Sequence, residues 1–291
     1  MNSYFKKIKK LIQFTFGSRP LVFWWSIKYR NGLPKENFGD ILTPYLVNKI
    51  SKQEVLFFEL KSQFATIFKH YLMVGSIITF ATKKSVIWGS GIISKSQPIK
   101  EATFLAVRGP RTQKRLRELG YPVPNIVGDP ALLLPLIYKP KKEVKYELGI
   151  IPHYVDEQLA IELRGNASNT TIISLLTDEI EPVINKLLEC KAVISTSLHG
   201  LIIAHAYGIP ARWIQLSENL SGDGTKFYDY LESLDMVSEK IDCRGFTLES
   251  LSPNIDFHLP CPSNVRNLQE GLLSVYPLQI KDDRLLSIIN R

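Results

Sequence analysis

The sequence of 291 residues is poor in cysteine, and its three cysteines follow no pattern. They are scattered, odd in number and without a CxxC pair: Cys190, Cys243 and Cys261. This argues against a disulfide framework or a cysteine zinc site and predicts a protein of the reducing cytoplasm. No apolar run approaches the roughly 18–20 residues that a membrane-spanning helix needs. With 45% hydrophobic residues, the chain is long enough to bury a large core in one or two domains.

Acidic residues are absent from residues 1–35, which hold eight of the 36 lysines and arginines. The rest of the chain therefore carries 28 basic and 28 acidic side chains, so the net charge of +8 belongs to one end. A nucleic-acid enzyme more often has a basic face through its body, and we expect no nucleic-acid partner. Lysines interrupt the apolar residues of segment 1–16 and no small-residue cleavage site follows, so no secretory signal is predicted.

Residues 1–20 are predicted to form a basic amphipathic helix. Five apolar residues recur there at helical spacing, with four lysines between them: Tyr4, Phe5, Ile8, Leu11 and Ile12. Two interpretations stay open. The helix lies on an anionic membrane surface, which would place the cytoplasmic protein at the inner face of the membrane. Alternatively, its apolar face docks on the body of the protein.

Strand-like and helix-like segments alternate along the rest of the chain, which predicts an α/β fold of two Rossmann-like, doubly wound domains. We place the first domain at 21–140, the second at 141–262, and a late helical segment, able to pack back on the first domain, at 263–291. A charged, proline-containing stretch at 139–145 (KPKKEVK) is the predicted linker. Strands are predicted at 21–27, 71–78, 86–93, 103–107, 126–127, 146–151, 170–175, 192–195 and 211–215. Helices are predicted at 41–50, 111–119, 178–190, 201–207 and 264–275.

The segment 192–211 (AVISTSLHGLIIAHAYGIPA) is the most informative part of the sequence. A short apolar strand is followed by a polar turn with Ser197, His199 and Gly200, and then by a helix that ends at Gly208. In an open parallel sheet, ligands bind beyond the carboxyl ends of strands, where this turn lies. A helix N-terminus attracts an anion, and an imidazole there can carry a proton. His199 is therefore a candidate catalytic residue; a packed or capping histidine is the alternative.

Three other segments place chemically useful residues beside a strand end or a helix start. Arg108 follows the strand at 103–107 and Arg111 lies near the next helix start, where an arginine suits a carboxylate or phosphate; surface ion pairs are the alternative. Asp40 is placed either to cap the next helix or to line a cleft. Gly91 allows close backbone approach to a ligand, but no GxGxxG dinucleotide fingerprint is completed. No cluster has the spacing of a metal site.

Five further motifs accompany segment 192–211 along the chain. They are NFGD at 37–40, VRGPRT at 107–112, VGDPALLL at 127–134, IIPHYVD at 150–156 and KFYDYLESL at 226–234. In this order, over roughly residues 35–235, they resemble the motifs of the polysaccharide pyruvyl transferase family. The resemblance implies a GT-B-like arrangement with the active site in the interdomain cleft. It also implies phosphoenolpyruvate as co-substrate, with no cofactor and no metal.

The reaction of that family transfers pyruvate from phosphoenolpyruvate to two hydroxyls of one sugar, which gives a cyclic ketal. It requires an acid that protonates the vinyl carbon, a base for the hydroxyls, and cations for the phosphate and carboxylate. We expect His199 to be the main acid and His153 to be a second proton carrier or phosphate ligand. Asp40 or Asp129 would accept the hydroxyl proton, although a turn or cap role suits Asp129 better.

Substrate-binding residues follow from the same motifs. The expected phosphoenolpyruvate-binding residues are Arg108, Arg111, Ser197, Gly200 and Lys226. The expected acceptor-binding residues are Asn37, Asp40 and Gly91. Many family members have an arginine where Ser197 stands, so a cation is missing there. Either another cation compensates or the phosphoenolpyruvate is held differently; the candidate cations are Arg108, Arg111, Lys226 and Arg212.

The expected partners are phosphoenolpyruvate and a sugar or lipid-linked oligosaccharide, in the synthesis of a bacterial exopolysaccharide or capsule. Two other functions stay open. A GT-B glycosyltransferase that uses a nucleotide sugar would suit the same two-domain architecture. A non-catalytic, membrane-attached scaffold in polysaccharide assembly would suit the basic segment 1–20, although both histidines are present.

Overall fold

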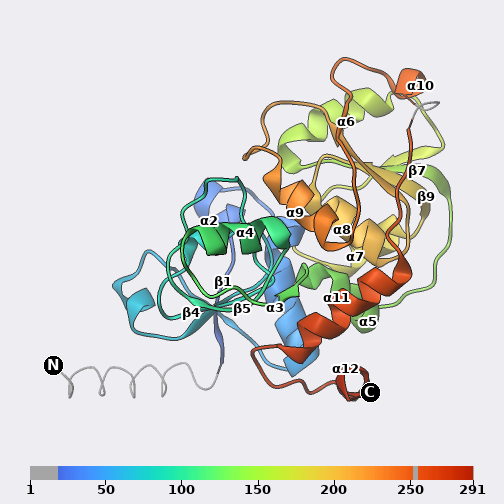
Figure 1. Cartoon of the computed structure of the whole chain (residues 1–291). Coiled ribbons are helices and arrows are strands. Elements are labelled where there is room, and N and C mark those ends of the chain that lie inside the picture. Colours follow the sequence, from blue (N-terminus) through green and yellow to red (C-terminus); the bar gives the residue numbers. More distant parts are fainter. Residues whose placement is uncertain (1–18, 252–254, 291) are drawn as a thin grey trace, which may run out of the picture.

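Two parallel β-sheets organise the chain (Figure 1). The computed structural model describes residues 19–251 and 255–290. The first sheet has the strand order β2-β1-β3-β4-β5-β6, and each neighbouring pair is parallel. Its strands are β1 (Leu21–Phe23), β2 (Leu56–Phe57), β3 (His70–Leu72), β4 (Ser85–Trp88), β5 (Thr103–Val107) and β6 (Ile126–Val127).

The second sheet is also parallel and has the order β11-β10-β9-β7-β8. Its strands are β7 (Tyr146–Ile151), β8 (Thr170–Ile172), β9 (Cys190–Ser195), β10 (Ala211–Gln215) and β11 (Ile241–Asp242). The predicted α/β class with repeated strand and helix units is thus confirmed. The stretch 139–145 between the two sheets contains no helix or strand.

Both sheets reverse their strand order at a corresponding place. Strand β1 lies between β2 and β3, and β7 lies between β8 and β9. The chain therefore leaves the first strand of each half in one direction and later returns to its other side. In open α/β sheets, ligands bind outside the carboxyl ends of the strands at such a reversal. The topology thus indicates one position in each half at which to look for a site.

Helices connect the strands and pack on the sheets. In the first half, the α-helices are α2 (Ile27–Asn31), α3 (Phe38–Ser51), α4 (Pro110–Glu118) and α5 (Leu134–Ile137). In the second half, they are α6 (Glu157–Arg164), α7 (Glu181–Leu187), α8 (Leu198–Ala206), α9 (Thr225–Ser233), α10 (Leu248–Leu251), α11 (Pro262–Ser274) and α12 (Asp283–Ile289). Short 3₁₀ helices are η1 (Gln63–Thr66), η2 (Ile78–Phe80), η3 (Pro130–Leu133) and η4 (Tyr154–Asp156).

One continuous apolar core joins the two halves. It contains buried side chains from both sheets, including Trp88 of β4 and Val193 of β9. Helix α8 is apolar around most of its circumference, as expected of a helix that is buried on several sides. It packs on β9 and β10 of its own half and on η3 of the other half. The turn at the start of α8 is therefore held rigidly from both halves.

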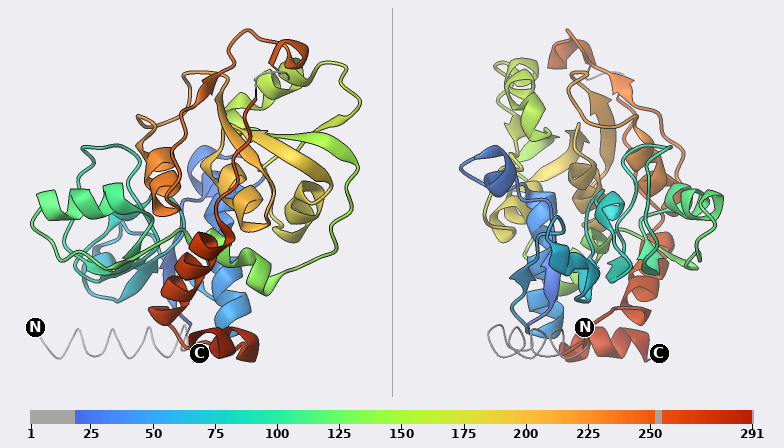
Figure 2. Two further views of the ribbon diagram at one scale, coloured as in Figure 1. Left: turned by 45° about the vertical axis from the view of Figure 1, so that its right-hand side comes forward. Right: turned by 90° about the vertical axis from the view of Figure 1, so that its left-hand side faces the viewer.

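Helix α11 returns from the second half and packs on the first (Figures 1 and 2). The indole Nε1 of Trp88 donates a hydrogen bond of 2.9 Å to the carbonyl of Leu272. The side-chain amide of Gln269 donates one of 2.7 Å to the carbonyl of Leu132. This late helix, predicted at 264–275, thus covers β6 and η3.

Several strands are shorter than the sequence predicted. The predicted strand 21–27 ends at Phe23, and α2 begins at Ile27. Ser26 caps this helix by accepting a hydrogen bond from the backbone N–H of Tyr29. The predicted strands at 71–78 and 86–93 end at Leu72 and Trp88. Positive φ angles at the glycines that follow, 99° at position 75 and 89° at position 89, accompany these turns.

The basic helix predicted at 1–20 lies almost wholly outside the described residues. No helix among residues 19–251 and 255–290 combines the length and apolar character that crossing a bilayer would need.

Candidate active site

A pocket of about 470 Å³ lies where the strand-order reversals of both sheets meet. From the first half, it is lined by residues that follow β1 and β3, including Trp25 and Ser76. From the second half, it is lined by residues that follow β7 and β9, including His153 and His199. The two strand-order reversals, which are far apart in the sequence, therefore contribute to a single pocket.

His199 lies in the first turn of α8, and its ring rests on the backbone of Gly39 at the start of α3. A Cβ atom at Gly39 would lie 2.0 Å from Nδ1 of His199, so only glycine permits this contact. The Nε2 atom is buried and has no hydrogen-bond partner within the described residues. Burial, with the charges of Arg108 and Lys226, lowers the pKa of His199 to about 3. The ring is therefore neutral at pH 7.

His153 precedes the short helix η4, and its Nδ1 accepts a hydrogen bond of 3.4 Å from the backbone N–H of Val155. The backbone N–H of His153 donates a hydrogen bond of 2.8 Å to Oγ1 of Thr196, which connects the end of β7 to the turn after β9. Its ring contacts that of Tyr154, with centroids 4.4 Å apart. Burial, and then Lys226, lower the pKa of His153 to about 4. Both histidines are thus neutral at pH 7.

Asp40 lines the same pocket from the first turn of α3. Its pKa is raised well above the ordinary value by burial and by Glu36, while Lys226 acts in the opposite direction. Of the two alternatives for Asp40, the capping role is wrong, because the Oδ1 atom of Asn37 accepts the capping bond from Gly39 N–H at 3.0 Å. With no capping bond to make, the carboxyl of Asp40 is available to the pocket.

The loop before α3 is fixed by the other half of the molecule. The N–H of Phe38 donates to the carbonyl of Leu175 at 2.8 Å, and the N–H of Thr177 donates to the carbonyl of Glu36 at 2.8 Å. This two-way pairing forms an isolated antiparallel bridge. It fixes Asn37, which also lines the pocket, relative to the segment that follows β8.

Among the described residues, Lys226 is the single lysine or arginine that lines this pocket. It is the second residue of α9, and its Nζ donates to the carbonyl of Ser221 at 3.4 Å. Burial, and then the charge of Arg108, lower the pKa of Lys226 to about 8, against the opposing effect of Asp40. The amine is therefore mostly charged at pH 7.

Arg108 lies behind the wall of the pocket rather than in its lining. Its guanidinium is fully buried and forms an ion pair of 3.0 Å with Oδ2 of Asp229. It also donates to Oγ of Ser76 at 2.7 Å and to the carbonyl of Ile92. A Cβ at Gly91 would lie 2.6 Å from Cζ of Arg108, so Gly91 makes room for the guanidinium. Arg108 thus acts on the pocket through its charge and through Ser76.

Two other arginines that were candidates by sequence, Arg111 and Arg212, lie outside this pocket. Arg111 forms an ion pair of 2.6 Å with Glu232 and lines a separate hollow beside α4. Arg212 donates to Oγ of Ser238 and to the ring of His258. Neither side chain lines the pocket that contains His199.

The remaining predicted residues have mainly structural surroundings. Asp129 is buried, and its Oδ1 caps η3 by accepting from the N–H of Ala131 at 3.0 Å. Burial raises its pKa to about 6. A Cβ at Gly200 would lie 2.3 Å from Oγ of Ser195, so Gly200 allows α8 to pack closely on β9. Ser197 lines the pocket at the N-cap position of α8, and its side chain forms no capping bond.

The pocket is also lined by residues outside the predicted site set, among them Tyr154, Ser76 and Ser221. Ser76 follows a strand and a glycine, which is a detectable signal, whereas nothing near Ser221 indicated where its loop would lie. Asp229, the buried partner of Arg108, was also missed, although it lies inside the motif KFYDYLESL. In the described part of the chain, no three His, Cys, Asp or Glu side chains gather as metal ligands would.

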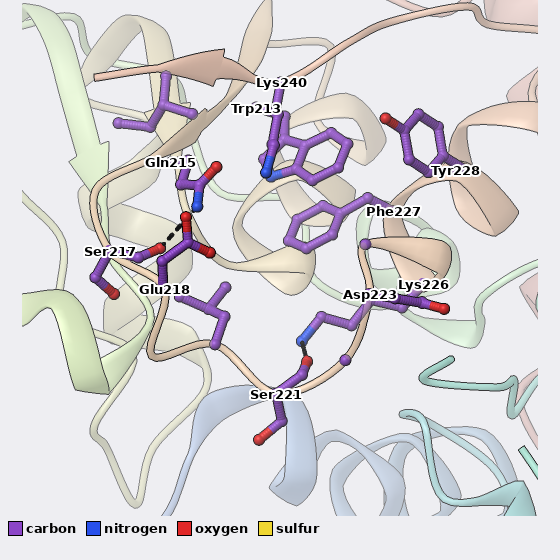
Figure 3. A pocket seen from close by; sticks show the side chains of 14 residues that line it. Trp213, Gln215, Ser217, Glu218, Ser221, Asp223, Lys226, Phe227, Tyr228 and Lys240 are labelled. Atoms are coloured by element: carbon purple, nitrogen blue, oxygen red, sulfur yellow. Dashed lines mark hydrogen bonds between the residues drawn. The ribbon is translucent and has the colours of Figure 1, made fainter. Parts of the chain in front are cut away.

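A smaller pocket of about 230 Å³ adjoins the first one (Figure 3). It lies beyond the carboxyl end of β10, and Ser221 and Lys226 line both pockets. The loop before α9 and the first turn of that helix therefore border both pockets.

Comparison with known proteins agrees with the motifs. The sequence model of the family described as "Polysaccharide pyruvyl transferase" matches residues 37–218. An uncharacterised protein of Acanthamoeba polyphaga mimivirus is 38% identical over 169 residues, which is 56% of this chain and 59% of that protein. The chain thus aligns with little more than half of that relative. No solved structure is significantly similar to the chain.

Proposed function

The chain belongs to the polysaccharide pyruvyl transferase family, and we propose that it transfers pyruvate from phosphoenolpyruvate to two hydroxyls of one sugar. The product is a cyclic ketal, made during synthesis of a bacterial exopolysaccharide or capsule. One observation carries the proposal: the pocket between the two sheets brings Lys226, the N-terminus of α8 and three proton-carrying groups together. These are the groups that the reaction requires.

The anionic groups of phosphoenolpyruvate would be held at the second-sheet side of the pocket. Lys226 supplies the positive charge, and the first N–H groups of α8 beside Ser197 supply hydrogen-bond donors. We infer that Lys226 takes the place of the arginine that many relatives have at position 197. Arg108 adds a buried positive charge without direct contact.

Asp40 is the group best suited to protonate the vinyl carbon, because burial raises the pKa of its carboxyl and so favours the protonated form. This proposal exchanges the roles first expected for Asp40 and His199. His199 is neutral at pH 7, so it begins as a base. Bound phosphoenolpyruvate offsets the charges of Lys226 and Arg108, and this raises the pKa of His199 toward its ordinary value.

The protons then balance over the whole reaction. The Asp40 proton adds to the vinyl carbon, and one sugar hydroxyl bonds to the neighbouring carbon while His199 accepts its proton. Phosphate leaves with the proton from His199. The second hydroxyl bonds to the same carbon, and its proton returns to Asp40. His153, beside Lys226, is the proposed phosphate ligand. No redox step occurs, so no redox cofactor is needed.

We further propose that the two sheets are the cores of two domains, at 21–140 and 141–262, in a GT-B-like arrangement. The first domain would hold the acceptor near Asn37, and the second would hold phosphoenolpyruvate. The acceptor is proposed to be lipid-linked, with residues 1–20 at the anionic inner face of the cytoplasmic membrane.

The test is incubation with phosphoenolpyruvate and lipid-linked galactose, glucose or mannose, followed by mass spectrometry for an added pyruvate ketal. Asp40→Asn should lower kcat at least about a hundredfold, because the amide cannot donate the proton. Arg111→Ala, which alters a residue outside the pocket, is the control. Stabilisation by nucleotide sugars but not by phosphoenolpyruvate would favour a glycosyltransferase instead. A folded protein that turns over no substrate would favour the scaffold.

A further inference from the structure

The turn after β3 is held on both sides of Ser76. The hydroxyl of Ser90, which is fully buried, donates a hydrogen bond of 2.8 Å to the carbonyl of Gly75. It also accepts one of 3.3 Å from the backbone N–H of Ile77. The carbonyl of Gly75 accepts a second bond, from the N–H of Gly91 at 3.2 Å. The backbone of Ser76, which lines the pocket between the two sheets, is therefore fixed by the protein alone.

The hydroxyl of Ser76 has a proton that it can donate to a ligand. Nη1 of Arg108 donates a hydrogen bond of 2.7 Å to Oγ of Ser76. Among the described residues, no group accepts a hydrogen bond from this hydroxyl. A serine hydroxyl has one proton and two lone pairs, so the guanidinium occupies a lone pair and leaves the proton free. The guanidinium is fully buried, whereas Ser76 is partly exposed, so the proton is available on the side of the pocket.

The charge behind Ser76 suits an anionic ligand. Arg108 pairs with Asp229 of α9, which lies one turn after Lys226 on the same helix. Ser76 therefore lies where the first half meets the wall that carries Lys226. Burial lowers the pKa of both His199 and Lys226, and the charge of Arg108 adds to this effect, so that charge acts across this part of the pocket. A hydroxyl whose oxygen is bound to a cation is polarised, and it forms its strongest hydrogen bond with an anionic oxygen.

We propose that the Ser76 hydroxyl binds the carboxylate of phosphoenolpyruvate. The inference rests on the proposed function and adds to it the residue that recognises the second anionic group of this substrate. Phosphoenolpyruvate carries its carboxylate and its phosphate ester on the same carbon. With the phosphate at Lys226 and the start of α8, the carboxylate would face the adjoining wall, to which Ser76 belongs. Ser76 would thereby distinguish phosphoenolpyruvate from phosphate esters that have no carboxylate.

The test removes the hydroxyl from the protein and the carboxylate from the ligand, separately and together. Calorimetry measures the affinity of the full chain for phosphoenolpyruvate and for vinyl phosphate, which is phosphoenolpyruvate without its carboxylate. Ser76→Ala should weaken the binding of phosphoenolpyruvate about tenfold or more, because a hydrogen bond to a charged group is lost. It should leave the affinity for vinyl phosphate unchanged. Ser76→Cys, which introduces a weak donor of similar shape, should behave like Ser76→Ala, and Ser76→Thr should keep the wild-type ratio of the two affinities.

Thr79→Val is the matched control for these variants. Thr79 lines the same pocket, but its hydroxyl already donates a hydrogen bond of 2.9 Å to the carbonyl of Pro98. The ratio of the two affinities should therefore not change in Thr79→Val. Urea unfolding shows that each variant is folded before its affinities are compared.

Three results would overturn the proposal. Wild-type affinity for phosphoenolpyruvate in a folded Ser76→Ala or Ser76→Cys would show that the hydroxyl does not bind this substrate. Equal losses of affinity for the two ligands would assign the hydroxyl to the phosphate instead of the carboxylate. Both results leave the proposed pyruvyl transfer intact, because turnover with a sugar acceptor is measured separately. If the wild type neither binds nor turns over phosphoenolpyruvate, the proposed function itself fails, and the proposed role of Ser76 fails with it.

Discussion

Replacing Gly39 by alanine tests the contact on which the proposed site depends. The added Cβ would lie 2.0 Å from Nδ1 and 2.4 Å from Cε1 of His199, whereas ordinary contacts begin near 3.4 Å. The ring must therefore move by more than 1 Å, or α3 must shift and carry Asp40 with it. Misplacement of a catalytic group by about 1 Å can lower the rate about a hundredfold. We expect a loss of that size in kcat/KM.

The same substitution should leave the fold intact. Alanine is favoured over glycine inside helices by up to about 1 kcal/mol, which offsets part of the strain. Urea unfolding should therefore show a change within about 1 kcal/mol, while NMR of the His199 ring shows a changed environment. Gly271→Ala is the matched control: this glycine lies within α11, and the shortest contact of its added Cβ would be 3.3 Å, to Cγ2 of Ile126. Wild-type turnover in Gly39→Ala would refute the assignment of His199 and Asp40 to one site.

Three further predictions use other parts of the structure. Lys226→Ala should weaken phosphoenolpyruvate binding about tenfold or more in calorimetry, because a hydrogen bond from a charged group is lost. Arg111→Ala is the control and should leave this affinity unchanged. Equal effects of the two substitutions would argue against Lys226 as the phosphoenolpyruvate-binding cation. Asp229→Leu should cost about 3–5 kcal/mol in urea unfolding, because Arg108 stays buried without its partner, and a second change, Arg108→Leu, should restore part of it. His205 has a pKa lowered to about 4 by burial, so the unfolded chain takes up a proton first as pH falls below 6.5. His205 alone should then lower the free energy of unfolding by about 3 kcal/mol between pH 6.5 and 4. His205→Phe should remove this contribution from the decline.

The sequence determined the local structure well. Strands β5, β6, β7 and β10 have the bounds that the sequence predicted. The segment 192–211 folds as a strand, a turn and a helix, as predicted, but the helix begins at Leu198, so His199 and Gly200 lie in its first turn rather than in the polar turn. Its motifs also indicated the family, and they drew attention to His199, His153 and Asp40, all of which line one pocket.

Tertiary structure alone decided which charged groups face that pocket and in which protonation state. Arg108 and Lys226 were equal candidates by sequence. In the structure, Arg108 is held in an ion pair by Asp229 of the other half, whereas Lys226 lines the pocket. Likewise, the side chain of Asn37 caps α3, so Asp40 does not cap it and lines the pocket instead. The physical reason is that ion pairing and desolvation depend on neighbours distant in the chain, whereas helix and strand formation depend mostly on residues close by. The pKa values of His199 and Asp40 therefore follow from the packing of the two halves.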